Sequence, residues 1–289
     1  MGFELGILFA FGAMLCWGFG DFFIQRSARK IGDIEALAFI GIIGAIGLLP
    51  FVLQELPVLF SVPNLALLAF IGIVTFVFAI IDFEALKKGK LSVVEVILEF
   101  ELPLTAFLGF LFFQEAPSFL QLRIICLIFF GIILIAVKKL PTKNHSKIFE
   151  KGLFLALLGA IGMAVINFLT AYGSKAVSPI LAIWVPWVIF TIISLVLIWK
   201  REGFPKFVQN AKKNWGIILG MGIFDTLAWL FFATAVLDND LAITIAITES
   251  YVAVALILGV IINKEKIHLH QYAGAIITLV ASFALGMLV

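Results

Sequence analysis

Ten long apolar segments divide the chain, and each is long enough to cross a bilayer as a helix. Their residues are apolar on all sides, whereas the strands of a membrane barrel alternate between apolar and polar positions. In hydrocarbon the backbone must satisfy its own hydrogen bonds, which favours helices. The pattern therefore predicts an all-α integral membrane protein with transmembrane helices at roughly 4–24, 35–54, 64–86, 91–113, 119–137, 152–172, 178–199, 214–236, 241–262 and 268–288.

Composition supports a lipid environment. Hydrophobic residues make up 63% of the chain and charged residues only 13%, with a mean hydropathy of +1.18. A soluble protein usually carries about a quarter charged residues. A soluble fold of this length could not bury so much apolar surface, so lipid is the expected solvent.

The basic residues fall almost entirely in alternate connectors. The connectors after the first, third, fifth, seventh and ninth segments hold all of the Lys and Arg residues except Arg123 and Lys175. By the positive-inside rule these connectors face the cytoplasm. We therefore expect a multi-pass protein of the plasma membrane, with both termini outside and the connector between the fifth and sixth segments cytoplasmic.

The chain contains an internal repeat. Residues 85–115 match residues 235–265 at a constant offset of 150, which pairs Glu99 with Glu249 and Glu115 with Glu265. Five helices per half is an odd number, so the halves must cross the membrane in opposite directions. We expect repeats at 1–140 and 152–289, joined by a cytoplasmic linker at 141–151. Inverted repeats are typical of secondary transporters, although a duplication without transport would also produce them.

These features resemble the EamA-type permeases of the drug/metabolite transporter superfamily. The resemblance rests on Trp17-Gly18 in the first segment and on the two repeated runs, 85–115 and 235–265. It implies two five-helix repeats and a permease for amino acids or other metabolites, with nucleotide sugars and sugar phosphates carried by some relatives. Many relatives are drawn with both termini in the cytoplasm, but the distribution of Lys and Arg in this chain predicts the opposite.

Acidic residues inside the segments are the main functional signal, because each costs at least about 2.5–3.5 kcal/mol near the bilayer centre. Glu99 and Glu249 correspond in the repeat, so we expect them to meet across a central cavity. Glu101 lies about 200° around a helix from Glu99, and the two can face one cavity only if Pro103 distorts the turn. Neighbouring carboxyl groups could hold a proton or bind an ammonium group. Alternatively, each acid pairs with a basic residue or caps kinked backbone.

Other candidates extend this path. Asp21 and Asp82 end their segments near the cytoplasmic surface, where they are either gate residues or simple ion pairs. Aromatic faces beside carboxylates suit amine-bearing substrates through cation–π contacts, whereas Asn167 could instead form only an interhelical hydrogen bond. The remaining candidates for the substrate or proton pathway are Glu95, Asp225, Trp17, Trp184, Trp229, Tyr251 and Asn167.

Motifs for other functions are missing from the sequence. There is no HExxH or GxSxG motif and no Gly-rich phosphate loop, so we expect no enzyme activity, no metal and no cofactor. We expect no nucleic-acid partner and a monomer or weak dimer in the bilayer. The sequence favours a secondary transporter that moves a small metabolite, such as an amino acid or amine, by alternating access with possible proton coupling. The alternatives are an intramembrane enzyme and a non-transporting scaffold.

Overall fold

The protein is a bundle of helices. The structure, a computed structural model, describes residues 4–88, 96–137, 151–201, 203–262, 264 and 266–289. Within these residues ten helices are long and apolar enough to cross a membrane, which confirms the predicted number. The elements are α1 (Leu5–Ile31), α2 (Asp33–Val52), η1 (Leu56–Phe60), α3 (Val62–Lys88), α5 (Glu101–Leu108), η2 (Gly109–Phe113), α6 (Phe119–Ala136), α7 (Lys151–Ala176), α8 (Pro179–Arg201), α9 (Phe204–Asp238), α10 (Leu241–Glu249), α11 (Tyr251–Ile262) and α12 (Leu269–Gly286).

Helix α9 is much longer than its predicted span, which began at residue 214. It starts at Phe204 with a proline in the first turn and has non-helical angles at Asn214 (φ −122°, ψ 19°). The residues before this kink include Lys206, Lys212 and Lys213. These lysines lower the local hydropathy, so the pattern of apolar residues does not predict a helix there. The apolar span and the basic helical extension therefore meet at Asn214.

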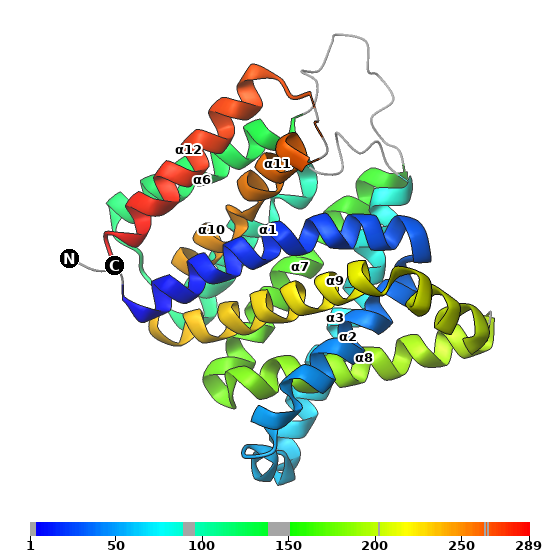
Figure 1. The fold of residues 1–289 in the computed structure, drawn as a ribbon. Coiled ribbons are helices and arrows are strands. Elements are labelled where there is room, and N and C mark those ends of the chain that lie inside the picture. The colour runs from blue at the N-terminus through cyan, green and yellow to red at the C-terminus, as the bar shows by residue number, and fades with distance from the viewer. Residues whose placement is uncertain (1–3, 89–95, 138–150, 202, 263, 265) are drawn as a thin grey trace.

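The helices pack mainly across the two repeats. Helix α1 lies against α9 and α3 lies against α7, while α2 packs on α8, α5 on α10 and α6 on α12. Figure 1 shows α6 and α12 running side by side, as do α1 and α9. The counterparts in the two repeats are α1 and α7, α2 and α8, α3 and α9, and α6 and α12, while α5 with η2 belongs to the fourth span and α10 with α11 forms the ninth. Exchanging each span with its counterpart leaves the set of packed pairs unchanged. The two halves are therefore related by a pseudo-twofold axis, and their odd number of crossings makes the repeats inverted.

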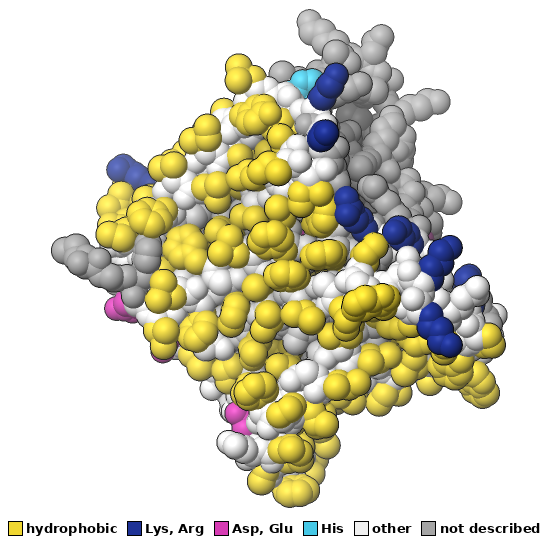
Figure 2. Space-filling model, in the orientation of Figure 1, with side chains coloured by type: hydrophobic (Ala, Val, Ile, Leu, Met, Phe, Trp, Pro, Cys, Tyr) yellow, Lys and Arg dark blue, Asp and Glu magenta, His cyan; other side chains and the backbone are white. Residues whose placement is uncertain are grey.

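The surface has the character of a membrane protein. Hydrophobic side chains cover the face of the bundle in Figure 2. Large hydrophobic residues such as Phe107 and Phe110 are more than half exposed. Lys and Arg side chains gather at the end of the bundle opposite the start of α1 and the end of α12. Apolar sides with charge concentrated at one end fit a multi-pass protein in a bilayer.

Helices α6 and α12 approach closely at a pair of glycines. A Cβ atom added at Gly274 would lie 2.6 Å from the carbonyl oxygen of Gly131. Membrane helices often associate through small residues, which let their backbones come together. Because the opposing atom is backbone, a side chain at Gly274 could be accommodated only if the helices moved apart.

We expect Gly274→Val to destabilise the protein by about 1–3 kcal/mol, the usual cost of overpacking a tight interface. The melting temperature of the purified variant measures this effect. Gly47→Val on α2 is the matched control, because a Cβ atom at Gly47 would meet nothing within 4 Å. Equal melting temperatures for the two variants would show that the α6–α12 approach does not limit stability.

Candidate functional site

Two transmembrane helices are interrupted at equivalent positions. In the first repeat, helical residues 96–98 are followed by a turn at Glu99 and Phe100 before α5 begins at Glu101. In the second repeat, α10 ends at Glu249 and α11 begins at Tyr251. Positions 99 and 249 correspond at the repeat offset of 150. Interrupted helices in inverted-repeat transporters commonly surround the substrate and ion sites.

The two interruptions have different local causes. Proline at position 103 has no N–H to donate to the carbonyl of Glu99, four residues earlier, and its ring crowds that carbonyl. The Glu99 carbonyl instead accepts the N–H of Leu102 at 3.3 Å. The second repeat has no proline there. At its break, the Ser250 hydroxyl donates to the carbonyl oxygen of Ala246 at 2.9 Å and also contacts the Ser282 hydroxyl.

The interruptions bring three carboxyl groups together. Glu249 is 3% exposed, and its carboxyl group interacts electrostatically with that of Glu101. Glu99 is also close enough to interact electrostatically with Glu249. Glu249 therefore interacts both with Glu99, its counterpart in the repeat, and with Glu101. The turn at residues 99 and 100 removes the 200° separation that a continuous helix would impose on Glu99 and Glu101.

Asp82 and Asp21 extend this acidic group toward the basic end of the bundle. The Asp82 carboxylate interacts electrostatically with both Asp21 on α1 and Glu101 on α5. Gly159 on α7 makes room for this part of α3, since a Cβ atom added there would lie 3.4 Å from Asp82 Oδ1. Acids from α1, α3, α5 and α10 therefore form one connected cluster, which we call the acidic cluster: Asp21, Asp82, Glu99, Glu101 and Glu249.

A cluster of aromatic rings lies beside the acidic cluster. The Trp17 ring is 5.1 Å from that of Trp229 and 6.2 Å from that of Tyr251, measured between centroids. Trp229 is in turn 5.9 Å from Trp187. Tyr251 interacts electrostatically with Glu249, which joins the aromatic rings to the acids. Trp187 occupies the place in the cluster expected for Trp184, whose indole N–H instead donates to the Ala45 carbonyl at 2.9 Å.

The remaining predicted residues lie in other places. Asp225 on α9 is 8% exposed and makes no hydrogen bond or ion pair with the described residues; its backbone nitrogen faces Gly20 of α1. Asn167 on α7 is buried, and its side-chain Nδ2 has no partner within the part of the chain that the structure describes. The expected interhelical hydrogen bond from this nitrogen is therefore not seen there. Glu95 lies outside the described residues.

The sequence matches the model of the EamA-like transporter family over residues 4–137 and again over 150–287. The chain belongs to the EamA-like transporter family. No curated protein matches it in sequence. Its fold is similar to a solved structure described as "Crystal structure of protein", with a TM-score of 0.77 and 13% identity over 99% of this chain and 98% of the other. At this identity the structural match supports the fold alone.

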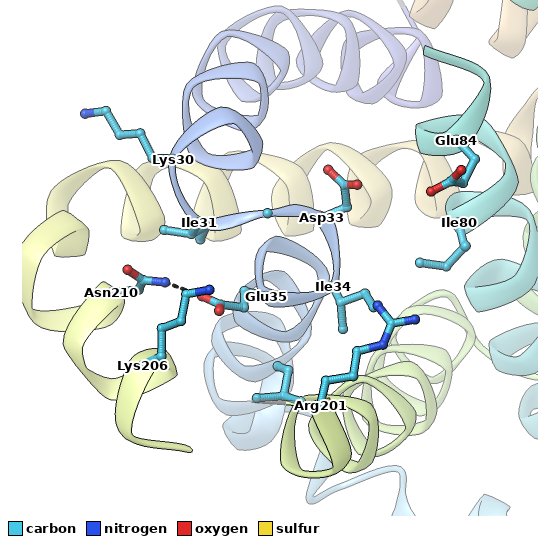
Figure 3. A pocket seen from close by; sticks show the side chains of 12 residues that line it. Lys30, Ile31, Asp33, Ile34, Glu35, Ile80, Glu84, Arg201, Lys206 and Asn210 are labelled. Atoms are coloured by element: carbon cyan, nitrogen blue, oxygen red, sulfur yellow. Dashed lines mark hydrogen bonds between the residues drawn. The ribbon is translucent and has the colours of Figure 1, made fainter. Parts of the chain in front are cut away.

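This EamA-like transporter also has a cavity at its basic end. The cavity has a volume of about 470 Å³ and lies where the ends of α1, α2, α3, α8 and α9 converge. Figure 3 shows basic side chains (Lys30, Arg201, Lys206) and acidic ones (Asp33, Glu35, Glu84) around it. Glu35 is buried, and its Oε2 accepts a hydrogen bond from Asn210 Nδ2 at 2.6 Å.

Helix α3 separates this cavity from the acidic cluster. Ile80 and Glu84, one helical turn apart, line the cavity, whereas Asp82 lies on the side of α3 that packs against α7. Among the described residues, no group of His, Cys, Asp and Glu has the geometry of a metal site. The chemistry that the acidic cluster offers is therefore proton binding and recognition of positive charge by carboxylates and aromatic faces.

Proposed function

We propose that this EamA-like transporter is a secondary carrier that exchanges protons for a small amine-bearing metabolite by alternating access. The single observation that carries the proposal is the electrostatic interaction between the carboxyl groups of Glu101 and Glu249, which lie at the breaks in two transmembrane helices. Two ionised carboxylates that lie close together in a site of low dielectric repel each other, which favours a proton on one of them. A pair that holds one proton can release it when a cation arrives.

The surroundings of the pair support exchange with a cation. The groups that act electrostatically on Glu101, Glu249 and Asp82 are all acidic among the described residues. A cationic substrate would therefore meet carboxyl groups contributed by several helices. Trp17, Trp229 and Tyr251 add aromatic faces next to Glu249, and such faces attract ammonium groups. The substrate class that best fits is a small amine or amino acid.

We further infer that the basic end of the bundle is cytoplasmic and that both termini face outward in the plasma membrane. Support comes from the concentration of Lys and Arg at the end opposite the termini. With this orientation, Asp21 and Asp82 lie on the cytoplasmic side of Glu101 and Glu249. They are then positioned as gate residues through which protons and substrate reach the pair from inside.

Transport can be measured directly with purified protein in proteoliposomes. We expect vesicles preloaded with an unlabelled amine or amino acid to take up the labelled compound faster than empty vesicles. An imposed proton gradient should then drive its accumulation. A panel of amines, amino acids, sugars and nucleotides would identify the substrate. Saturable counterflow of a sugar or nucleotide, with none of any amine or amino acid, would contradict the proposed substrate class.

A further inference from the structure

A polar contact joins the two repeats at the end of the bundle away from the basic connectors. Glu115 follows η2 in the first repeat and is only 8% exposed. Its Oε1 accepts a hydrogen bond from Lys175 Nζ at 3.1 Å, at the end of α7 in the second repeat. Its Oε2 accepts the backbone N–H of Leu241 at 2.6 Å, at the start of α10. One carboxylate therefore ties three chain segments together.

The packing around this carboxylate is tight. A Cβ atom added at Gly109 would lie 2.7 Å from Glu115 Oε2 and 3.2 Å from Leu241 Cβ. Lys175 also lies over the ring of Phe113, with its Nζ 4.3 Å from the ring centre. A carboxylate at the first turn of a helix is stabilised by the free N–H groups there. These contacts hold the outer end of α10 against η2.

Helix α10 connects this contact to the acidic cluster. It runs from Leu241, whose N–H Glu115 accepts, to Glu249, which interacts electrostatically with Glu101. All nine of its residues are buried. A movement that exposes the first turn of α10 would therefore break its contact with Glu115.

The three residues of this contact are only partly repeated in the sequence. Glu115 and Leu241 correspond at the 150 offset to Glu265 and Leu91, which lie outside the described residues. Lys175 directly follows Ser174, which matches Ser27 in the first repeat, so its counterpart is Ala28. The glutamate and leucine are thus repeated in the sequence, but the lysine occurs in one half only. The lysine that pairs with Glu115 therefore has no equivalent at the corresponding position of the first repeat.

We propose that Glu115, Lys175 and the first turn of α10 form a latch that closes the outer gate and makes the outer-closed state the resting state. This inference rests on the proposed transport function. Burial raises the pKa of the Glu115 carboxyl and Asp240 adds to the rise, while Lys175 and the Leu241 N–H act in the opposite direction. Because the burial cost offsets part of the attraction, the latch can reopen in each cycle.

The latch can be tested without any substrate. Ala242 is 4% exposed in the first turn of α10, so a thiol introduced by Ala242→Cys should react slowly with a maleimide while the gate is closed. The background carries Cys16→Ser and Cys126→Ser, and the protein is held in nanodiscs so that the reagent reaches both sides. We expect Glu115→Gln and Lys175→Met each to raise the labelling rate at least threefold.

Two controls separate a latch from a general loss of structure. Lys175→Arg keeps the positive charge and should leave the labelling rate close to that of the parent. Asp238→Asn changes an exposed acid near the start of α10 and should also leave it unchanged. Unchanged labelling in both Glu115→Gln and Lys175→Met would overturn the proposal, as would equal acceleration in Asp238→Asn. Because labelling needs no substrate, it does not depend on the outcome of the counterflow assay.

Discussion

Replacing Glu249 with glutamine should abolish transport driven by a proton gradient, with a fall of at least tenfold in initial rate. Glutamine keeps the size of the side chain and can still hydrogen bond to Glu101, but it cannot bind and release a proton. The variant should therefore fold normally. Substrate accumulation against pH in proteoliposomes, with melting temperature measured in parallel, checks both parts of this expectation.

Two further variants show whether the carboxyl pair itself couples transport to the proton gradient. Glu101→Gln should lose coupling to a similar extent, because the proton is held by the two carboxyl groups together and both are needed to bind and release it. Asp238→Asn removes an exposed acid far from the pair and should transport normally. If Glu101→Gln and Glu249→Gln both retain proton-driven accumulation, the proton site lies elsewhere. Asp225, a buried acid without a described partner, would then be the next candidate.

Replacing Pro103 with alanine should reduce transport at least tenfold without lowering thermal stability. Alanine supplies the N–H that proline lacks, so the carbonyl of Glu99 could accept a regular helical hydrogen bond. A continuous helix would place Glu99 and Glu101 about 200° apart and turn one of them away from Glu249. Initial transport rates and melting temperatures of the purified variant measure the two effects.

Pro179→Ala is the matched control for this change. Pro179 is the first residue of α8. At this position of a helix the backbone N–H has no partner within the helix, so its absence in proline costs nothing. We expect this variant to transport at the parental rate. Normal transport by Pro103→Ala would mean that the interruption in the first repeat is not needed to assemble the carboxyl pair.

The number of helices and their inverted arrangement could be predicted from the sequence because each depends on local composition. A run of about twenty apolar residues predicts a transmembrane helix wherever it occurs, and the Lys and Arg residues of each connector predict the side of the membrane on which it lies. Helix ends were harder to predict. The basic first part of α9 is helical because a proline-led first turn starts it, and its polarity hides it from any search based on hydropathy.

The carboxyl pair could be predicted only in part. The repeat placed Glu99 opposite Glu249, but Glu101 also interacts with Glu249, because the helix is interrupted at residues 99 and 100. Pro103 signalled a distortion in the first repeat. At the matching break in the second repeat, the Ser250 hydroxyl bonds to the carbonyl oxygen of Ala246. A serine in an apolar run does not indicate a break, since the same residue often leaves a helix intact.

The role of Glu115 could not be predicted from local sequence. In the repeat it was only a matching position, and its partners Lys175 and Leu241 lie 60 and 126 residues further along the chain. Pairing over such distances is decided by which helices pack together. The contacts of Glu115 therefore become apparent only when α7 and α10 are placed beside η2.

The interleaving of the repeats has a consequence for how the protein is made. The pairs α1–α9, α2–α8, α3–α7, α5–α10 and α6–α12 each join the two halves, so the first five helices have few lasting partners among themselves. During synthesis they enter the bilayer well before their partners are translated. Insertion and assembly must therefore be separate stages, with the early helices waiting in lipid until the second half arrives. A ribosome that stalls in the connector at residues 138–150 would leave a correctly inserted but unassembled half, exposed to membrane quality control.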